Sequence, residues 1–493
     1  MATSYKTLKE DFVSNLAGGD ISEINWVTAV APAAVLLWSA LQSRQTFFTP
    51  YHLPAIVTDF LLNICAILCA TTIYSSQLIL LNLLISAPAL LLYTIPPSRP
   101  KSEKAKPPSN KRLNASTKLE GIDSFPVRPF ITTYRGAMMI VTCTSILAVD
   151  FHVFPRRFAK VETWGTSLMD LGVGSFVFSS GVVSAKAAVK DQMSPKPPTL
   201  FQRLAAAIRH SIPLLILGVA RLYSVKNLEY AEHVTEYGVH WNFFFTLGFL
   251  PPFVALFQSV FSVIPSYAVL SFLIALIYQV TLESTPLQAY VLTAPRTNLI
   301  SQNREGMASF IGYLAIFLAG RGTGSFLMPR FPLPSNQLPP TRMRHLLLQK
   351  LAIYTAAYIL LFLIVTSFKF GSTPISRRLA NLPYILWVSA FNNGQILVLA
   401  LIETMYFPSV YQAADLATEK RESERATSRI LKAYNRNGLV IFLAANLGTG
   451  LINLSVNTLN VGIKGAMGVL MGYVFALTGL ALGLDAYDIS IKL

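Results

Sequence analysis

Residues 150–170 read DFHVFPRRFAKVETWGTSLMD and lie between two apolar runs, ITTYRGAMMIVTCTSILAV at 131–149 and LGVGSFVFSSGVVSA at 171–185. The flanking runs predict two membrane-spanning helices, because a helix of about 20 mainly apolar residues crosses a bilayer. The segment between them holds three acids, three bases, a His and a Trp. Ionisable groups are costly to bury at a membrane boundary, so this density indicates a functional site. The competing interpretation is that the segment only anchors a helix end.

The composition extends the membrane interpretation to the whole chain. Of its 493 residues, 53% are hydrophobic and 13% charged, and the mean hydropathy is +0.49. Soluble domains carry about 25% charged residues. The polar, mixed-charge residues 1–25 do not have the basic start of a cleaved signal peptide, so we expect the first span to direct insertion. The sequence predicts an all-α, polytopic membrane protein with a single transmembrane domain over residues 1–493.

Apolar runs predict about thirteen spans, which place the two termini on opposite sides of the membrane. They lie near 26–43, 53–73, 78–96, 131–149, 166–185, 211–225, 242–262, 265–282, 306–320, 347–368, 384–406, 437–455 and 465–485.

The basic residues predict the orientation of these spans. Lys and Arg concentrate in the third, fifth, ninth and eleventh loops, and the net charge is +16. These loops alternate along the chain and fall on one side, which the positive-inside rule makes the cytoplasm. We therefore expect a lumenal N-terminus and a cytoplasmic C-terminus. The third loop, 97–130, is predicted to be basic, disordered and cytoplasmic, so its sequon at Asn114 should carry no glycan. The spread of charge over separate loops argues against nucleic acid as a partner.

The even-numbered loops then share the lumenal side, and they contain most of the unusual polar residues. In loop four, burial at the end of a span would raise the pKa of Asp150, and nearby cations would lower it. An Asp held between these two influences suits the role of general base. Lys160 suits stabilisation of an oxyanion, and Arg156 and Arg157 suit phosphate contacts. His152 is a second candidate base. Anchoring by the arginines and a simple Asp150–Lys160 ion pair remain open alternatives.

Two other polar groups have open interpretations. In loop six, Glu232, Glu236 and His240 would share a face if the segment is helical, which fits metal binding, substrate contact or a solvated surface. No HExxH motif occurs, and we predict no metal site. Asn446, Asn453 and two neighbouring polar residues form a stripe on a late span that either packs helices or lines a cavity. Cys65, Cys69 and Cys143 lie within apolar runs and form no disulfide framework. No Walker A loop, Rossmann glycine pattern or Gly-x-Ser-x-Gly is present.

Five segments carry a resemblance to a known family. They are Asp150–Asp170, Val225–Phe244, Asn303-Arg-Glu-Gly306, Ser376-Arg-Arg-Leu-Ala-Asn-Leu-Pro383 and Asn446–Asn457. Together they resemble the inositol acyltransferases of glycosylphosphatidylinositol (GPI) anchor biosynthesis, the family of fungal GPI-anchored wall transfer proteins and PIG-W. The likeness runs from end to end, and the third and ninth loops show no recognisable pattern.

The resemblance implies a multi-pass enzyme of the endoplasmic reticulum membrane that is a target of antifungal inhibitors. Its reaction would be the transfer of a fatty acyl chain, typically palmitoyl, from acyl-CoA as co-substrate to the inositol of glucosaminyl-phosphatidylinositol, with no permanently bound cofactor. We expect Asp150 to act as base on the inositol hydroxyl, with Lys160 as the oxyanion or base-tuning group and His152 as the reserve base. Candidates for the substrate phosphates are Arg156, Arg157, Lys226, Arg304, Arg377 and Arg378. The other residues assigned to substrate binding are Glu162, Trp164, Asp170, Asn227, Glu232, His233, His240, Trp241, Asn303, Asn446 and Asn453.

Two rival functions fit the polytopic architecture. A lipid or solute transporter of the endoplasmic reticulum membrane would move substrate without acylation, and its charges would be spread through the spans. A non-catalytic scaffold subunit would lose assembly rather than chemistry when its loop motifs are changed. Acyl-chain preference, the route of acyl-CoA to the site and the oligomeric state are not specified by the sequence.

Overall fold

The computed structural model describes residues 5–97, 125–196, 198–226, 234–256, 263–329, 340–368, 373–412 and 415–491. Within these ranges the chain is helical and contains a single isolated β-bridge, between Gly18 and Thr166. The predicted all-α class is confirmed. The basic segment 98–124, with the sequon at Asn114, lies outside the described residues.

The helices fall at the predicted spans. Eleven of those in the described ranges are long and apolar enough to cross a membrane by length and composition, where thirteen spans were predicted. The remaining two predicted positions hold the shorter apolar helices α5 (Leu78–Leu91) and α10 (Phe243–Leu256). The long spans are α2 (Ile21–Gln45), the continuous run α3–η1–α4 (Leu53–Thr71), α6 (Pro129–Ala148), α7 (Leu168–Met193), α8 (Leu200–Lys226), α11 (Tyr267–Ser284), α14 (Arg304–Leu327), α15 (Pro340–Ser367), α16 (Leu382–Tyr406), α19 (Gly438–Ser455) and α20 (Ile463–Ala486).

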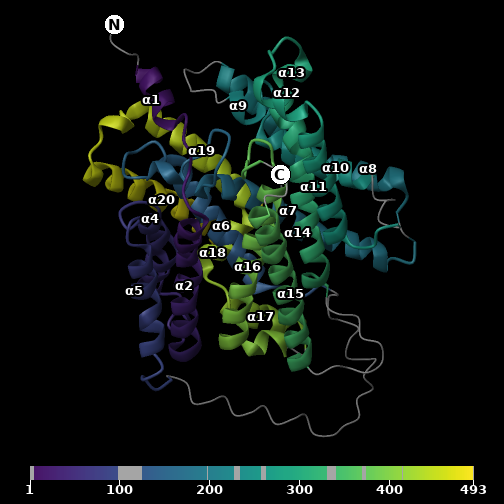
Figure 1. Cartoon of the computed structure of the whole chain (residues 1–493). Coiled ribbons are helices and arrows are strands. Elements are labelled where there is room, and N and C mark those ends of the chain that lie inside the picture. Colours follow the sequence, from purple (N-terminus) through teal and green to yellow (C-terminus); the bar gives the residue numbers. More distant parts are fainter. Residues whose placement is uncertain are drawn as a thin grey trace.

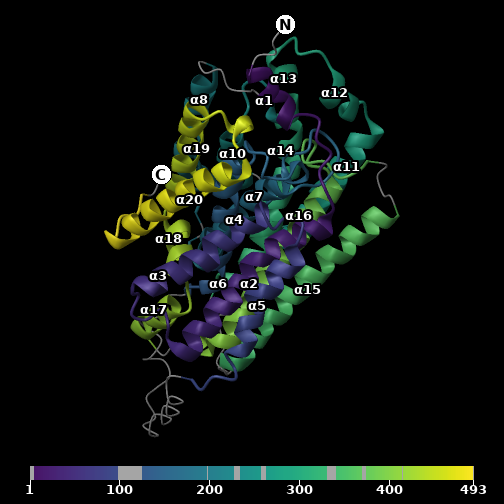
Figure 2. The same ribbon diagram turned by 90° about the vertical axis from the view of Figure 1, so that its left-hand side faces the viewer.

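The shorter elements lie mainly at the two ends of the bundle. They are α1 (Tyr5–Val13), η2 (Arg156–Phe158), α9 (Val234–Tyr237), α12 (Leu287–Thr293), α13 (Leu299–Gln302), η4 (Pro408–Tyr411), α17 (Leu416–Arg425), α18 (Arg429–Arg436) and η5 (Thr458–Asn460). Figures 1 and 2 both show α1, α12 and α13 at one end of the molecule and α17 at the other.

The centre of the bundle is the pair α7 and α14, which pack along each other. Glycines permit this close approach, since a Cβ added at Gly181 would lie 2.0 Å from the carbonyl oxygen of Phe317 and one at Gly320 would lie 2.1 Å from that of Phe178. Small residues at crossing points are typical of membrane helices, because van der Waals packing replaces the hydrophobic effect there. This pair gives the site a rigid support.

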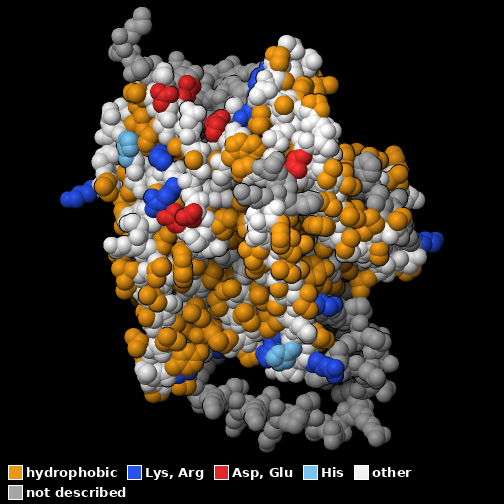
Figure 3. Space-filling view, in the orientation of Figure 1, with side chains coloured by type: hydrophobic (Ala, Val, Ile, Leu, Met, Phe, Trp, Pro, Cys, Tyr) orange, Lys and Arg blue, Asp and Glu red, His pale blue; other side chains and the backbone are white. Residues whose placement is uncertain are grey.

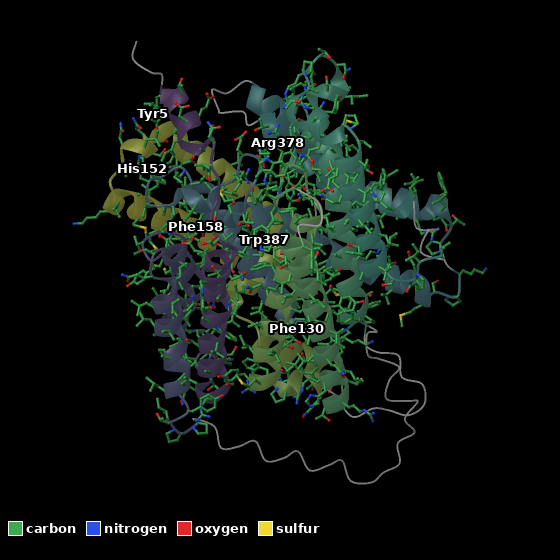
Figure 4. The ribbon with its side chains drawn as sticks, in the orientation of Figure 1. Tyr5, Phe130, His152, Phe158, Arg378 and Trp387 are labelled. Carbon is green, nitrogen blue, oxygen red and sulfur yellow. The ribbon has the colours of Figure 1, made fainter. Side chains whose placement is uncertain are left out.

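The even-numbered loops and α1 meet at one end of the bundle, which we call the loop end. Backbone hydrogen bonds join the segments: Gly19 N donates to Thr166 O (2.8 Å), Gly165 N to Ile375 O (2.8 Å) and Val239 N to Gln302 O (2.9 Å). In Figure 4, Tyr5 and Arg378 lie toward this end, and Phe130 lies toward the opposite one. The structure thus gathers the even-numbered loops as the charge pattern predicted.

Ends of three odd-numbered loops meet at the opposite end. Val127 N donates to Glu419 (3.2 Å), Arg128 Nε to Leu327 O (3.0 Å) and Phe130 N to Glu403 (2.5 Å). The face shown in Figure 3 has a broad hydrophobic surface along the helices, and its acidic side chains lie in the upper half, toward the loop end. Which end faces the lumen stays a prediction.

Candidate active site

A cavity of about 850 Å³ opens beneath the loop end. Its walls come from α1 (Tyr5, Lys9, Phe12, Val13), α6 (Val141, Thr142, Ser145, Ile146), the segment 149–162 (Val149, Asp150, Ala159, Lys160, Val161, Glu162), α7 (Leu168, Met169, Gly172, Val173, Phe176), α8 to α10 (Arg221, Thr235, Glu236, Tyr237, Phe243), the segment before α16 (Arg377), and α19 with its following turn (Phe442, Asn446, Gly450, Asn453, Leu454, Ser455, Val456, Asn457, Leu459). Pockets that bind small molecules typically have volumes of about 300–1,000 Å³. The loop residues supply most of the charges, and the helices supply most of the apolar surface.

Asp150 stands in this cavity just beyond the last turn of α6. Its Oδ2 accepts a hydrogen bond from Asn453 Nδ2 (2.7 Å), and Asn453 Oδ1 in turn accepts one from Lys9 Nζ (2.7 Å). Burial raises the pKa of Asp150, while the Asn453 hydrogen bond and the charges of Lys9 and Arg156 lower it. A carboxyl group whose pKa is raised toward neutrality suits proton abstraction.

Lys160 forms an ion pair, but its partner is not Asp150. Its Nζ donates to both carboxylate oxygens of Glu236 (2.9 Å each). The open alternative of an Asp150–Lys160 pair is therefore wrong in this structure. An ammonium has three N–H donors, of which Glu236 accepts two.

The pair continues into the protein as a chain of alternating charges. Arg377 NH1 lies 3.3 Å from Glu236, and Arg377 Nε donates to Asp170 Oδ1 (2.6 Å). The other Asp170 oxygen accepts from Val161 N (3.0 Å) and Ser167 Oγ (2.7 Å). Asp170 is thereby a buried support for Arg377 and for the segment that carries Lys160, a role that residue type alone did not reveal.

The charges in this chain fix its protonation. Burial disfavours ionised Glu236, but Lys160 and Arg377 outweigh it and lower the pKa of Glu236 to about 2. Burial likewise disfavours charged Arg377, but Glu236 and Asp170 raise the pKa of Arg377 well above its ordinary value. Because Glu236 has a lowered pKa, its stabilising effect is complete above the ordinary value of 4.5 and is lost as pH falls toward 2.

Six residues predicted for the site line the cavity. They are Asp150, Lys160, Glu162, Arg377, Asn446 and Asn453. Asn446 and Asn453 of the polar stripe on α19 therefore line a cavity, whereas Thr449 of the same stripe packs against Tyr473 of α20. Asn446 Nδ2 donates to Phe442 O (2.7 Å), so its amide is partly engaged by its own helix.

Three predicted residues of segment 150–170 have structural contacts instead. Arg156 donates to the carbonyls of Val149 (2.8 Å), Phe151 (3.2 Å) and Phe154 (2.8 Å), and its guanidinium stacks 3.9 Å from the Phe12 ring centroid. Arg157 binds Glu23 (2.7 Å), which ties the segment to α2. His152 is exposed and does not line the cavity. Its ring packs edge-on against that of Phe12, with 4.6 Å between the ring centroids. The anchoring interpretation fits both arginines better than phosphate binding.

A second group of predicted residues builds the loop end rather than the cavity. These residues are Trp164, His240, Trp241, Asn303, Arg304 and Arg378, and none of them lines the cavity. Asn303 Oδ1 accepts from the backbone of both His240 (2.8 Å) and Trp241 (2.9 Å). Arg304 and Arg378 both lie beside buried Glu305 (3.6 and 3.2 Å). These polar side chains bind other parts of the loops. A sequence motif alone does not show whether a polar residue packs a loop or contacts a substrate.

Other predicted residues cannot be placed. Asn227, Glu232 and His233 lie outside the described residues, and Lys226 is described only as the last residue of α8. No group of three or more metal-binding side chains occurs in the part of the chain that the structure describes.

The residues assigned to the site from the sequence did not include Lys9, Arg221 and Tyr237, which line the cavity, and Glu236, which also lines it, was left with open interpretations. Glu236 drew attention only through its helical spacing with Glu232 and His240. Its partner Lys160 lies 76 positions away, so the pairing has no local signal.

Comparison with known proteins gives one consistent result. A family model described as GWT1 matches residues 5–484. GPI-anchored wall transfer protein 1 of Gibberella zeae is 57% identical over 498 residues, which cover 99% of each chain. The protein of the same name from Emericella nidulans is 56% identical over the full length of both chains, and that of Candida albicans is 39% identical over the full length of both.

Proposed function

The chain belongs to the GWT1 family, and from this membership we propose that it is an acyl-CoA-dependent inositol acyltransferase of GPI-anchor biosynthesis. The donor would be a fatty acyl-CoA such as palmitoyl-CoA, and the acceptor would be the inositol of glucosaminyl-phosphatidylinositol. The site of action would be the endoplasmic reticulum membrane. The observation that carries the proposal is that one cavity is lined both by Asp150 and Lys160 and by apolar side chains of the surrounding helices.

Asp150 is the base in this proposal. Its carboxylate accepts the proton of an inositol hydroxyl as that oxygen attacks the thioester carbonyl. Burial raises the pKa of Asp150 and so makes its carboxylate a stronger base. The hydrogen bond from Asn453 orients one of its two oxygens. A positioned general base contributes a rate factor of about 10²–10⁴.

Lys160 stabilises the negative charge that forms on the carbonyl oxygen. Two of its donors are held by Glu236, which fixes the ammonium in place and leaves the third for the tetrahedral oxyanion. Collapse of this intermediate breaks the carbon–sulfur bond and expels CoA as a thiolate, a good leaving group because the pKa of a thiol lies near 8.5. The thiolate takes up the proton that Asp150 accepted, which restores the base.

The remaining cavity surfaces suit the two lipidic substrates. Val173, Phe176, Phe243 and Phe442 line the cavity from three helices, and Phe176 packs against Phe243 and Phe442, which gives an apolar surface where an acyl chain would be buried. Arg221 and Lys9 also line the cavity and are its candidates for phosphate contacts. The earlier candidates Arg156, Arg157, Arg304 and Arg378 hold protein groups instead.

Purified protein incubated with radiolabelled palmitoyl-CoA and a glucosaminyl-phosphatidylinositol analogue tests the proposal. We expect a labelled inositol-acylated lipid, a decrease in kcat of about 10²–10⁴-fold for Asp150→Asn and one of about 10²–10³-fold for Lys160→Ala. Asp20→Asn is the matched control, because Asp20 is exposed, makes no side-chain cap and does not line the cavity.

Two results would contradict the proposal. One is the absence of any labelled lipid from folded wild-type protein, and the other is near-normal acylation by Asp150→Asn. Movement of unmodified lipid between vesicle leaflets without acylation would favour the transporter instead.

A further inference from the structure

A second, smaller cavity of about 60 Å³ adjoins the first one. It lies between α2, α6, α7 and α16, and four residues line both cavities: Val141, Thr142, Leu168 and Gly172. The four shared residues place the small cavity directly beside the large one, and we call it the extension because it lies next to the large cavity on the side toward α2 and α16.

The surface of this extension is apolar although several of its residues are polar. Tyr134 OH donates to Asn392 Oδ1 (2.6 Å), and Asn392 Nδ2 donates to Val388 O (2.7 Å). Thr28 and Thr142 direct their hydroxyls to the carbonyls of Ile24 (2.8 Å) and Met138 (2.9 Å) on their own helices. Because these polar atoms are satisfied within the protein, a ligand entering here meets mainly carbon.

The extension leads away from the reacting groups. Asp150 lies just beyond Ala148, the last residue of α6. At a rise of about 1.5 Å per residue, Val141 lies about 10 Å and Tyr134 about 21 Å down the helix from Ala148. A ligand that has its carbonyl at Asp150 and follows α6 therefore reaches the small cavity with its far end.

Gly172 stands where the two cavities meet. A Cβ added at this position would meet no atom within 4 Å, so the space beside it is open. A larger side chain could occupy that space without displacing backbone, and it would fill space where the linings of the two cavities meet.

We propose that the small cavity binds the methyl end of the acyl chain and that Gly172 sets the chain length the enzyme accepts. This inference rests on the acyltransfer proposed above and adds no chemical step, since it concerns only which methylenes are buried. Each buried methylene contributes about 0.8 kcal/mol, equivalent to a factor of about four in binding. Loss of a few methylenes from the cavity therefore produces a large change in selectivity.

Acyl-CoA donors of ten to eighteen carbons, each assayed with the same acceptor, test this inference. For Gly172→Leu we expect kcat/KM for the longest donors to fall by at least tenfold while that for the shortest stays within about threefold of wild type. The optimum then moves to shorter chains. Gly479→Leu is the matched control: Gly479 is also an uncrowded helical glycine, lies exposed on α20 and lines neither cavity, so its length profile should equal that of wild type.

Ala31→Leu provides an independent variant if Gly172→Leu does not fold. Ala31 lies on α2 and lines only the small cavity, so filling it should also shorten the preferred donor, with short-chain activity retained. An equal decrease at every chain length in folded variants, or an unchanged profile, would overturn the inference. Failure of the wild type to acylate with any donor would instead overturn the proposed function, and this inference with it.

Discussion

Asn453 orients the carboxylate of Asp150, and Lys9 determines which way the Asn453 amide points. A lysine ammonium can only donate hydrogen bonds, so the Asn453 oxygen must face Lys9 (2.7 Å). The amide nitrogen is then directed at Asp150 (2.7 Å) and stabilises its charged form. The N-terminal helix α1 thus acts on the base through one side chain of α19.

Replacement of Asn453 should shift the pH dependence of catalysis. The Asn453 hydrogen bond lowers the pKa of Asp150, so Asn453→Ala should raise that pKa. Because the reaction needs the carboxylate, we expect the acidic limb of the kcat/KM profile to move to higher pH and activity at low pH to fall most.

Asn446→Ala is the comparison for this variant. Asn446 lines the same cavity but donates to Phe442 O rather than to a carboxylate. We expect it to change the rate without moving the acidic limb. An identical shift for the two variants, or none for Asn453→Ala, would contradict the role of Asn453.

The sequence predicted those site residues that stand out chemically within their own segment. Asp150 and Lys160 occur as ionisable residues beside apolar runs, and Asn453 belongs to a polar stripe on a span. Lys9 was not predicted, and Glu236 was considered without its partner Lys160, because the contacts that matter join residues 444 and 76 positions apart. Arg157 and Asn303 were assigned to substrate because a polar residue that packs a loop looks the same in sequence as one that binds a ligand.

The loops at the loop end depend on buried ion pairs for their positions. Arg377 joins the segment before α16 to Asp170 on α7 and to Glu236 on α9, and its side chain is only 4% exposed. Removing one partner of a buried pair leaves an uncompensated charge and costs about 3–5 kcal/mol. These pairs therefore add to the backbone hydrogen bonds that join the segments of the loop end.

Arg377→Met should accordingly destabilise the protein by about 3–5 kcal/mol and lower its melting temperature in detergent. The matched control is Arg157→Met, because the Arg157–Glu23 pair is 39% and 25% exposed and should be worth no more than about 1 kcal/mol. Equal melting temperatures for the two variants would show that the buried chain of charges does not stabilise the loop end.

The spans themselves were predictable because their signal is local and long. Each predicted span coincides with an apolar helix, including α5 and α10, which are too short to count among the eleven. Local signals also explain where helices begin, as at α16, where the Asn381 side chain accepts from Tyr384 N and Pro383 lies in the first turn. The π-helical turn Leu61–Cys65 had no signal in the sequence that we could identify.

At the scale of the whole molecule, two independent observations agree on the topology. The odd-numbered loops are the ones rich in Lys and Arg, which predicts that they share one side of the membrane. In the structure, the ends of three of these loops meet near Glu403 and Glu419. The even-numbered loops and α1 meet at the other end, beside the cavity. The charge rule and the helix packing use different information, and they agree that odd-numbered and even-numbered loops lie at opposite ends. Placement of the active site on the lumenal side rests on the positive-inside rule alone.

Glycosylation mapping would test that placement. A sequon in a flexible tag ahead of Tyr5 should be glycosylated, because α1 packs at the loop end with the predicted lumenal loops. The same tag after Leu493 should stay unmodified, as should the natural sequon at Asn114, because the positive-inside rule places both in the cytoplasm. Endoglycosidase digestion followed by gel mobility measures each case. A glycan at Asn114, or one on the C-terminal tag, would reverse the orientation and move Asp150 to the cytoplasmic side, where acyl-CoA would reach it without crossing the membrane.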